Sequence, residues 1–155
     1  MESASARATS RVEWLIRQVT VSGLTLTVPR LEVRLYLDMV APGPPGVLQS
    51  AWLDTGAPLS VIPFHVQQSG LQWQSIPGIK ATSSGQRCEL GRIDCWLPTD
   101  QPPSLRGPLS LLAKFPQGDL PGDPVPSLLG LEFFLAHQAE FQLLLPPRDG
   151  SILLP

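Results

Sequence analysis

The chain has 155 residues, which is long enough for one domain with a substantial core and too short for two lobes. Its net charge of −2 includes no block of like charge, so neither nucleic acid nor a membrane surface is an expected partner. Charged residues make up 15% and apolar residues 43%, and such a shortage of polar surface is typical of a chain that covers part of its surface with another subunit. The 13 glycines and 18 prolines favour an all-β chain with many turns.

The N-terminal residues 1–11 are small and polar and are expected to form a flexible tail, followed by a single domain over residues 12–155. They do not have the apolar segment of a signal peptide, and no later apolar run reaches the roughly 18 residues of a membrane span. We therefore expect a soluble, cytoplasmic protein. Cys88 and Cys95 are too few for a disulfide framework and are expected to be reduced thiols, although one bridge between them is compatible with the sequence.

Alternating apolar and polar residues predict the first strands. The alternation is present within residues 12–28 and is clearest over residues 31–37, where every second residue is apolar. A proline- and glycine-rich loop over residues 42–46 precedes a further strand over residues 47–53. We expect this strand to pair with residues 31–37.

The middle of the chain predicts a short helix and a hairpin. Pro63 can open a helix over residues 64–68, which Gly70 would close. Residues 76–97 are expected to form a β-hairpin, in which a change in the apolar alternation predicts a bulge or bend at Gly91.

The last third of the chain predicts strands separated by proline-rich connections. A connector over residues 98–108 leads to a strand over residues 109–115, and residues 116–126 form a second long loop. A strand ending at Gly130 is followed by a short helix, and the chain closes with a hairpin of residues 141–145 and 151–154. The apolar side of the helix is expected to contain Leu131, Phe134, Leu135 and Gln138.

The motif that carries chemistry is Asp54-Thr55-Gly56-Ala57, which lies between two apolar runs. An acid after an apolar strand, followed by a small hydroxyl residue and a glycine, presents a carboxylate on a tight turn close to backbone N–H groups. This arrangement suits an aspartic protease. No second triplet of this kind occurs among the other aspartates, and chemistry that needs two carboxylates therefore implies a symmetric dimer.

The motif, the following Ser60-Val61-Ile62-Pro63, the glycine-tipped hairpin and Leu128-Leu129-Gly130 before a short helix resemble the retropepsin-like aspartic proteases. The resemblance covers residues 47–154, and the closing hairpin is more similar to that of the cellular and bacterial members than to the viral ones. It implies a closed all-β acid-protease barrel with one or two short helices and one lobe per chain. It also implies a homodimeric endopeptidase that acts on peptide or protein substrates without a cofactor.

By the same resemblance, two Asp54 carboxyls, one from each subunit, would meet and share one proton, because two like charges so close cannot both ionise. The ionised carboxyl would take a proton from a water, and the protonated one would hydrogen-bond the scissile carbonyl. The resemblance assigns three groups of residues to the site: the active-site loop with catalytic Asp54 and supporting Thr55, Gly56 and Ala57; a substrate-binding flap of Ser83, Ser84 and Gly85; and a second motif with Leu129 and Gly130.

Two departures from the family pattern leave an alternative function open. Leu131-Glu132 stand where retroviral members often carry Arg followed by Asp or Asn. Residues 1–40 have no direct counterpart in minimal retroviral enzymes, and we expect their strands to form the dimer sheet. The alternative is a non-catalytic dimerisation or peptide-binding module with the same fold, since a fold does not determine a function. The altered pair favours this alternative, whereas the retained Asp-Thr-Gly opposes it.

Other chemistries receive less support from the sequence. A lone Asp-Thr-Gly can be an ordinary turn, because Asp and Gly are favoured there. His65 and His137 have no matched partners in the sequence and are expected to be solvated surface residues. The spacings of the histidines and cysteines are unlike those of zinc sites, so we expect no metal.

Overall fold

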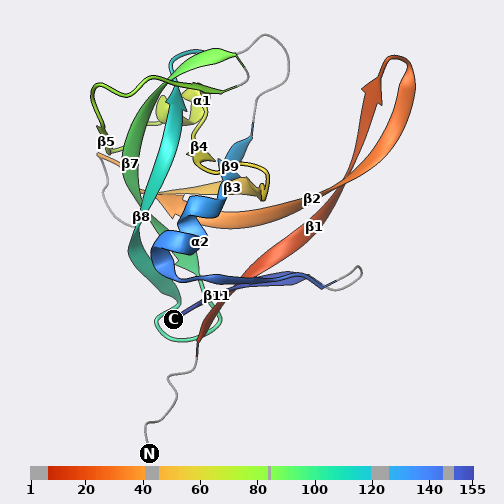
Figure 1. Cartoon of the computed structure of the whole chain (residues 1–155). Coiled ribbons are helices and arrows are strands. Elements are labelled where there is room, and N and C mark those ends of the chain that lie inside the picture. Colours follow the sequence, from red (N-terminus) through yellow and green to blue (C-terminus); the bar gives the residue numbers. More distant parts are fainter. Residues whose placement is uncertain (1–6, 41–45, 84, 120–125, 145–148) are drawn as a thin grey trace, which may run out of the picture.

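The computed structural model describes residues 7–40, 46–83, 85–119, 126–144 and 149–155 (Figure 1). Strands dominate these residues, and the helices among them are short, which confirms the expected mostly-β class with few helices. The elements in chain order are β1 (Ala8–Val21), β2 (Leu24–Leu37), β3 (Val47–Leu53), β4 (Ser60–Val61), α1 (Phe64–Gln67), β5 (Trp73–Ser75), β6 (Ala81–Ser83), β7 (Gln86–Pro98), β8 (Leu105–Pro116), β9 (Ser127–Leu129), α2 (Leu131–His137), β10 (Glu140–Gln142) and β11 (Gly150–Leu154).

The strands join in one hydrogen-bonded path, in the order β10-β11-β1-β2-β3-β9-β4-β8-β7-β5, with β6 paired to β7. Near its end, β2 also pairs with β7, where Tyr36 and Leu37 lie opposite Trp96 and Cys95. This pairing brings together two strands that are far apart in the path. Among the described residues, no helix is long and apolar enough to cross a membrane.

The first two strands form one long antiparallel ladder. Their register runs from Val12 opposite Val33 to Val21 opposite Leu24, and the turn between them uses Ser22 and Gly23 with φ of 49° and 77°. Positive φ at both central residues gives the turn type that suits the twist of a hairpin. In Figure 1 the far part of this ladder extends away from the other strands.

The N-terminal boundary of the sheet differs from the sequence expectation. β1 begins at Ala8 and pairs with β11 from Ala8–Leu154 to Val12–Gly150. Ala8 and Ser10 are both buried, because their small side chains face the core. Residues 8–11 therefore belong to the sheet rather than to the tail.

The strand that leads to the Asp-Thr-Gly motif has the predicted bounds. β3 pairs antiparallel with β2, as expected, with Ala51 opposite Val33 and Trp52 opposite Glu32. On its other side β3 pairs in parallel with β9, and β9 pairs in turn with β4 at Leu128 and Val61. The strands before and after the motif therefore lie on either side of β9.

The hairpin of β6 and β7 is present, with Ser83 opposite Gln86, but the predicted irregularity at Gly91 is wrong. Pairing of β7 with β8 runs without interruption through Gly91 and Ala113, and the register shift lies between Cys95 and Leu97. Glycine is needed at position 91 because a Cβ there would lie 2.6 Å from Cε3 of Trp73. The change in alternation marks the place where this indole covers β7.

The expected connector before β8 is also too long, since β8 starts at Leu105 and only residues 99–104 separate it from β7.

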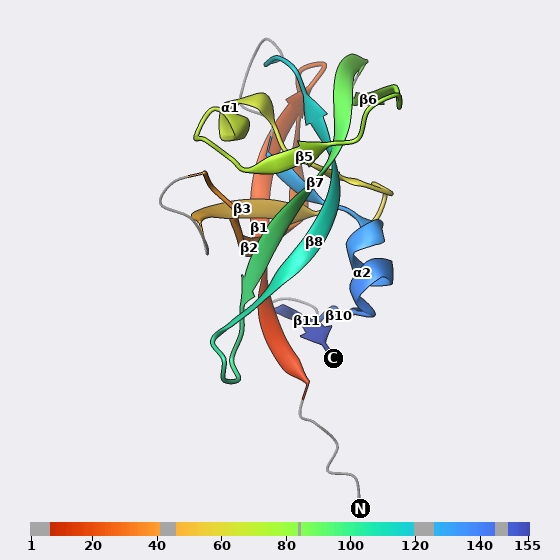
Figure 2. The same cartoon turned by 90° about the vertical axis from the view of Figure 1, so that its left-hand side faces the viewer.

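The expected apolar side of the helix α2 is wrong as well. Phe133 is fully buried, whereas Leu131 and Leu135 are 46% and 83% exposed. A helix of seven residues buries little more than one position, and Phe133 is the one that points to the core. Figure 2 shows α2 beside β8.

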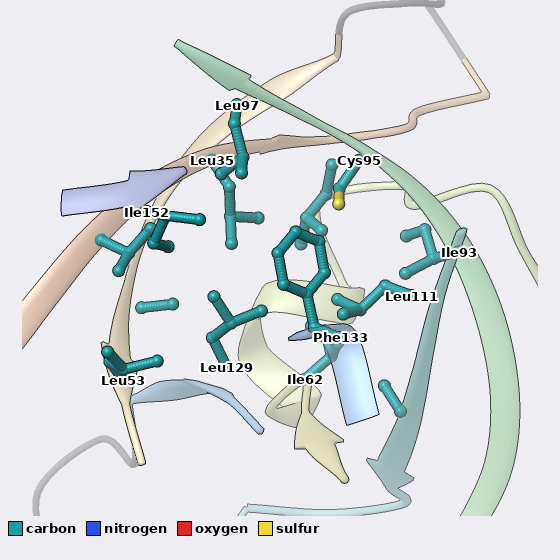
Figure 3. Packing of buried hydrophobic residues seen from close by; sticks show 14 of the residues in the cluster. Leu35, Leu53, Ile62, Ile93, Cys95, Leu97, Leu111, Leu129, Phe133 and Ile152 are labelled. Atoms are coloured by element: carbon teal, nitrogen blue, oxygen red, sulfur yellow. The ribbon is translucent and has the colours of Figure 1, made fainter. Parts of the chain in front are cut away.

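The core is formed by side chains from most of these elements (Figure 3). Its labelled members are Leu35, Leu53, Ile62, Ile93, Cys95, Leu97, Leu111, Leu129, Phe133 and Ile152. At its edge, the rings of Trp73 and Phe115 stack with centroids 3.9 Å apart. Cys88 and Cys95 are both free thiols and both buried, so the alternative of a bridge between them is not realised.

Candidate active site

Asp54 directly follows β3, where the chain leaves the sheet and turns. Its backbone N–H donates to the carbonyl of Leu129 over 3.0 Å, and its own carbonyl accepts a hydrogen bond from the N–H of Ala57. The N–H of Gly56 donates to Oδ1 of Asp54 over 2.9 Å. Asp54 and Ala57 are partly exposed, and Thr55 and Gly56 are exposed. The tight turn that the sequence predicts is present, with a backbone donor directed at the carboxylate.

The second predicted motif lies against this turn. Gly130 donates its N–H to Oγ of Ser60, a buried hydrogen bond of 3.0 Å. A Cβ at Gly130 would lie 2.5 Å from the backbone carbon of Leu59, so no larger residue fits without moving the backbone. The structure thus brings Leu129 and Gly130 together with the Asp54 loop.

The start of α2 also holds the loop in place. The first N–H groups of a helix have no partner within the helix. Here the N–H of Leu131 donates to the carbonyl of Ala57 over 2.9 Å, and that of Glu132 donates to the carbonyl of Pro58 over 2.9 Å. The Asp54 loop is therefore held by backbone hydrogen bonds that do not depend on the side chains of Leu131 and Glu132.

A pocket of about 270 Å³ opens beside the Asp54 carboxylate, and its described lining comes from β2, β3 and β9 and from the residues that directly follow β3 and precede β9. Its lining residues are Arg30, Trp52, Leu53, Asp54, Pro126 and Leu128. The guanidinium of Arg30 lies 5.0 Å from the centre of the Trp52 ring, which is within the range of a cation–π contact. Within the described part of the chain, this pocket contains one carboxylate, and a chemistry that needs two is incomplete in a single chain.

Arg30 and Trp52 were not among the predicted site residues. Trp52 could have been found from sequence, since it stands two positions before Asp54 and alternation places it on the face opposite the buried Ala51 and Leu53. Arg30 could not, because its place over Trp52 depends on the pairing register of β2 and β3.

The residues predicted for the flap that the structure describes do not line this pocket. Ser83 ends β6 and Gly85 follows in the turn with φ of 75°, whereas Ser84 lies outside the described residues. Lys114 donates to the carbonyl of Thr82 over 2.9 Å, which ties β6 to β8. Neither Ser83 nor Gly85 is among the residues that line the Asp54 pocket.

The two histidines have different surroundings. His65 is exposed, as expected, and its Nδ1 lies 3.7 Å from Oδ1 of Asp119. His137 is only partly exposed, contrary to expectation, because its Nε2 lies 2.7 Å from the carbonyl oxygen of Ser110. Among the described residues, no group of three or more His, Cys, Asp and Glu side chains is placed to hold a metal ion.

Comparison with known proteins gives a likeness in structure and none in sequence. No protein-family model and no curated protein sequence matches the chain. A similar solved structure is the crystal structure of a retropepsin-like aspartic protease from Rickettsia conorii, with 17% identity and a TM-score of 0.43. The match covers 99% of this chain and 96% of that chain. A likeness at this level concerns the overall fold and says nothing about activity.

Proposed function

We propose that the chain is an aspartic endopeptidase that works as a homodimer and hydrolyses peptide bonds in extended peptide or protein substrates. The observation that carries the proposal is the Asp54 turn. The carboxylate stands at the end of a strand, receives a backbone hydrogen bond from Gly56, and faces an open pocket that contains no other acid among its described lining. A second subunit related by a two-fold axis would supply the missing carboxyl.

In this dimer the two Asp54 carboxyls share one proton, since two ionised carboxylates in contact repel each other strongly. The ionised carboxyl acts as the base that takes a proton from the attacking water. The protonated carboxyl donates a hydrogen bond to the carbonyl oxygen of the substrate. Thr55 is exposed beside Asp54, and its hydroxyl is available to bond across the two-fold axis.

The finer features of the fold belong to the same proposal. The pairing of β2 with β7, which joins distant members of the strand path, supports a closed barrel with one lobe per chain. The hairpin of β6 and β7 contains Ser83 and Gly85 at its turn. It would close over a bound peptide as the flap predicted for Ser83, Ser84 and Gly85 and donate backbone hydrogen bonds to the peptide.

A second candidate function is a non-catalytic dimerisation or peptide-binding module. The observation that favours it is Glu132, whose Oε2 is buried and has no hydrogen-bond partner among the described residues. Glu132 is bonded to the Asp54 loop through its backbone N–H. An acid without a partner at this place indicates an incomplete polar network beside the Asp54 loop.

The test is the substitution Asp54→Asn, which preserves size and most of the hydrogen bonding but removes the titrating group. Cleavage of a diverse peptide library, read by mass spectrometry with and without a pepstatin-type inhibitor, should fall by about 10²–10⁴-fold or more. Asp94→Asn, an exposed aspartate on β7, is the matched control and should leave cleavage unchanged. Equal cleavage by Asp54→Asn and wild type would refute the catalytic role of Asp54.

Mixed dimers test whether the site is shared. Wild-type and Asp54→Asn chains are unfolded together, refolded at varied ratios and assayed at constant total concentration. Activity should fall as the square of the wild-type fraction, because only wild-type homodimers contain two carboxyls. A linear fall, after exchange of subunits has been verified, would show that each chain works alone.

A further inference from the structure

The outer parts of β1 and β2, residues 18–27, form an arm with two different faces. Side chains along a strand alternate between the two faces of a ladder, and the register assigns each pair to one of them. One face of the arm is polar and contains the pairs Gln18–Thr27 and Thr20–Thr25. The other is apolar and contains the pairs Val19–Leu26 and Val21–Leu24, and these four side chains are between 38% and 61% exposed. We call these four residues the apolar arm face.

The apolar side of the ladder changes between its root and its arm. At the root, Val12 and Val33 face each other and are fully buried in the core. Because every second residue of a strand lies on the same face, the face that is buried at the root continues into the polar face of the arm. The opposite face begins at the root with the pair Glu13–Glu32 and continues into the apolar arm face. The arm therefore directs its apolar residues to the side of the ladder opposite the one that the core covers.

A two-stranded hairpin by itself is marginally stable in water. No other element of the described residues covers the arm, since residues 18–27 are all exposed and Figure 1 shows the arm standing clear of the other strands. The described part of the chain therefore leaves the apolar arm face uncovered. Contiguous exposed apolar residues of this kind mark interaction surfaces.

The apolar arm face lies on the same face of the ladder as the pocket at Asp54, with the pair Arg17–Val28 between them. Arg30, on the same face of the ladder as Leu26, lies over Trp52, and both residues line that pocket with Asp54. Trp52 lies opposite Glu32 of the ladder and opposite Leu128 of β9. The side of the sheet that holds the incomplete carboxylate site is thus the side from which the apolar arm face runs outward.

We propose that the apolar arm face packs against a second copy of this chain, in the same two-fold assembly that brings the two Asp54 loops together. The inference rests on the proposed function, because the missing carboxylate identifies the occupant as a second copy. In a two-fold dimer the same patch occurs on both subunits, and a patch made of Val and Leu is complementary to itself. The low charged fraction of the chain, 15%, agrees with a surface that is covered in the assembly.

The test compares two double substitutions at adjacent pairs of the arm. Val19→Lys with Leu26→Lys places two charges on the apolar arm face, and Gln18→Lys with Thr27→Lys places the same two charges on the polar face. Sedimentation velocity over a range of concentrations measures dimerisation, and thermal unfolding followed by circular dichroism measures folding. The first variant should weaken dimerisation by about 100-fold or more, because like charges would be buried against each other, and the second should dimerise like wild type. If the lysines unfold the chain, Val19→Thr with Leu26→Thr removes apolar surface with a residue that suits a strand and should weaken the dimer in the same direction.

The outcomes separate this inference from the proposed activity. A wild-type chain that stays monomeric, or two variants with equal effects on dimerisation, would overturn the role of the apolar arm face. Cleavage that depends on Asp54, together with an undisturbed dimer in the Val19→Lys, Leu26→Lys variant, would overturn it too, while the activity would stand. If the wild-type protein cleaves no peptide and this variant loses the dimer, the result would support the role of the apolar arm face and contradict the proposed enzymatic activity.

Discussion

The root and the tip of the β1–β2 ladder contain the same kinds of residues in different surroundings. At the root, Val12 and Val33 have no exposed surface, whereas at the tip Val21 and Leu24 are 54% and 61% exposed. Both pairs lie directly opposite each other in one uninterrupted register. The difference comes from the layers around them, because the root has β11 and β3 at its edges and the core beneath it, and the arm has neither.

This contrast shows that alternation in a strand identifies an apolar face and does not identify what covers it. In the root the chain's own core covers the apolar face, so removal of an apolar side chain lowers the free energy of unfolding. In the arm the same removal acts on association instead. The two ends can therefore be separated by experiments in which folding and dimerisation are measured independently.

The largest effect is expected from matched truncations of two leucines of β2. Leu35, at 2% exposure, and Leu26, at 43%, lie on the same strand. Leu35→Ala should lower the free energy of unfolding by about 2–5 kcal/mol, because it leaves a cavity in the core. Leu26→Ala should cost the monomer less than about 1 kcal/mol, since it loses only a cross-strand contact. Urea unfolding at several protein concentrations measures both.

Protein concentration gives the control for that prediction. The effect of Leu35→Ala should be the same at every concentration, whereas that of Leu26→Ala should grow where the wild type is dimeric. A concentration-independent loss of several kcal/mol in Leu26→Ala would mean that the arm is packed within its own chain, and the contrast between root and tip would disappear.

Thiol reactivity sharpens the same comparison. Burial, with a smaller contribution from Asp94, raises the pKa of the Cys95 thiol from its ordinary value of 9.0 to about 12. Because the thiolate is the reactive form, three units of pKa lower its fraction at pH 8 by about a thousandfold. A cysteine introduced by Thr27→Cys, on the exposed polar face of the arm, should be alkylated at an ordinary rate while Cys95 stays at least about a thousandfold slower. Site-resolved mass spectrometry measures both cysteines in one sample.

Denaturant supplies the control for the thiols, since the two cysteines should react at similar rates in the unfolded chain.

The raised pKa of Cys95 also has a consequence for stability. A raised pKa in the folded state favours the protonated thiol, so this contribution to stability is complete below about pH 9 and is lost as pH rises towards about 12. Rapid alkylation of Cys95 in the native protein at pH 8 would contradict its burial.

The sequence predicted those parts of the molecule that depend on neighbouring residues. The bounds of β3 and the turn at Asp54 follow from an apolar run that ends in Asp-Thr-Gly, and the helix α1 follows from Pro63. Leu129, which accepts from Asp54, and Gly130, which donates to Ser60, were found because a glycine after an apolar strand end is a local signal. Their roles in catalysis stay predictions.

The parts that were missed depend on pairings between distant segments. Arg30 meets Trp52 only through the register of β2 and β3, and no pattern within either strand contains that information. The exposed side of α2 was predicted wrongly because seven residues are too few to define a helical period. The arm was not predicted as a hairpin, since the alternation within residues 12–28 reveals neither the turn at Ser22 and Gly23 nor that its apolar side is opposite the core.

The smallest effect is expected at Gly91 of β7. Unlike the exposed arm, β7 is covered at this position by the side chain of Trp73. A Cβ at position 91 would lie 2.6 Å from Cε3 of Trp73 and 2.8 Å from the carbonyl oxygen of Gln74. Trp73 is itself stacked on Phe115 with an interplanar angle of 5°, so it cannot move away without losing that contact. Gly91→Ala should therefore lower the free energy of unfolding by about 1–3 kcal/mol through overpacking.

The matched control is Gly118→Ala, where the added Cβ would lie 3.2 Å from Nε2 of Gln86, the far end of a flexible side chain. This substitution should change the free energy of unfolding by less than about 0.5 kcal/mol, as surface substitutions usually do. Urea unfolding gives both values, and tryptophan fluorescence reports whether the indole of Trp73 has shifted. Because the strain arises within one chain, the loss in Gly91→Ala should be the same at every protein concentration, unlike that of Leu26→Ala. If Gly91→Ala is as stable as wild type, Trp73 does not pack on β7 in this way. The glycine would then have to be explained by a bulge in the strand, although the pairing register shows none at this position.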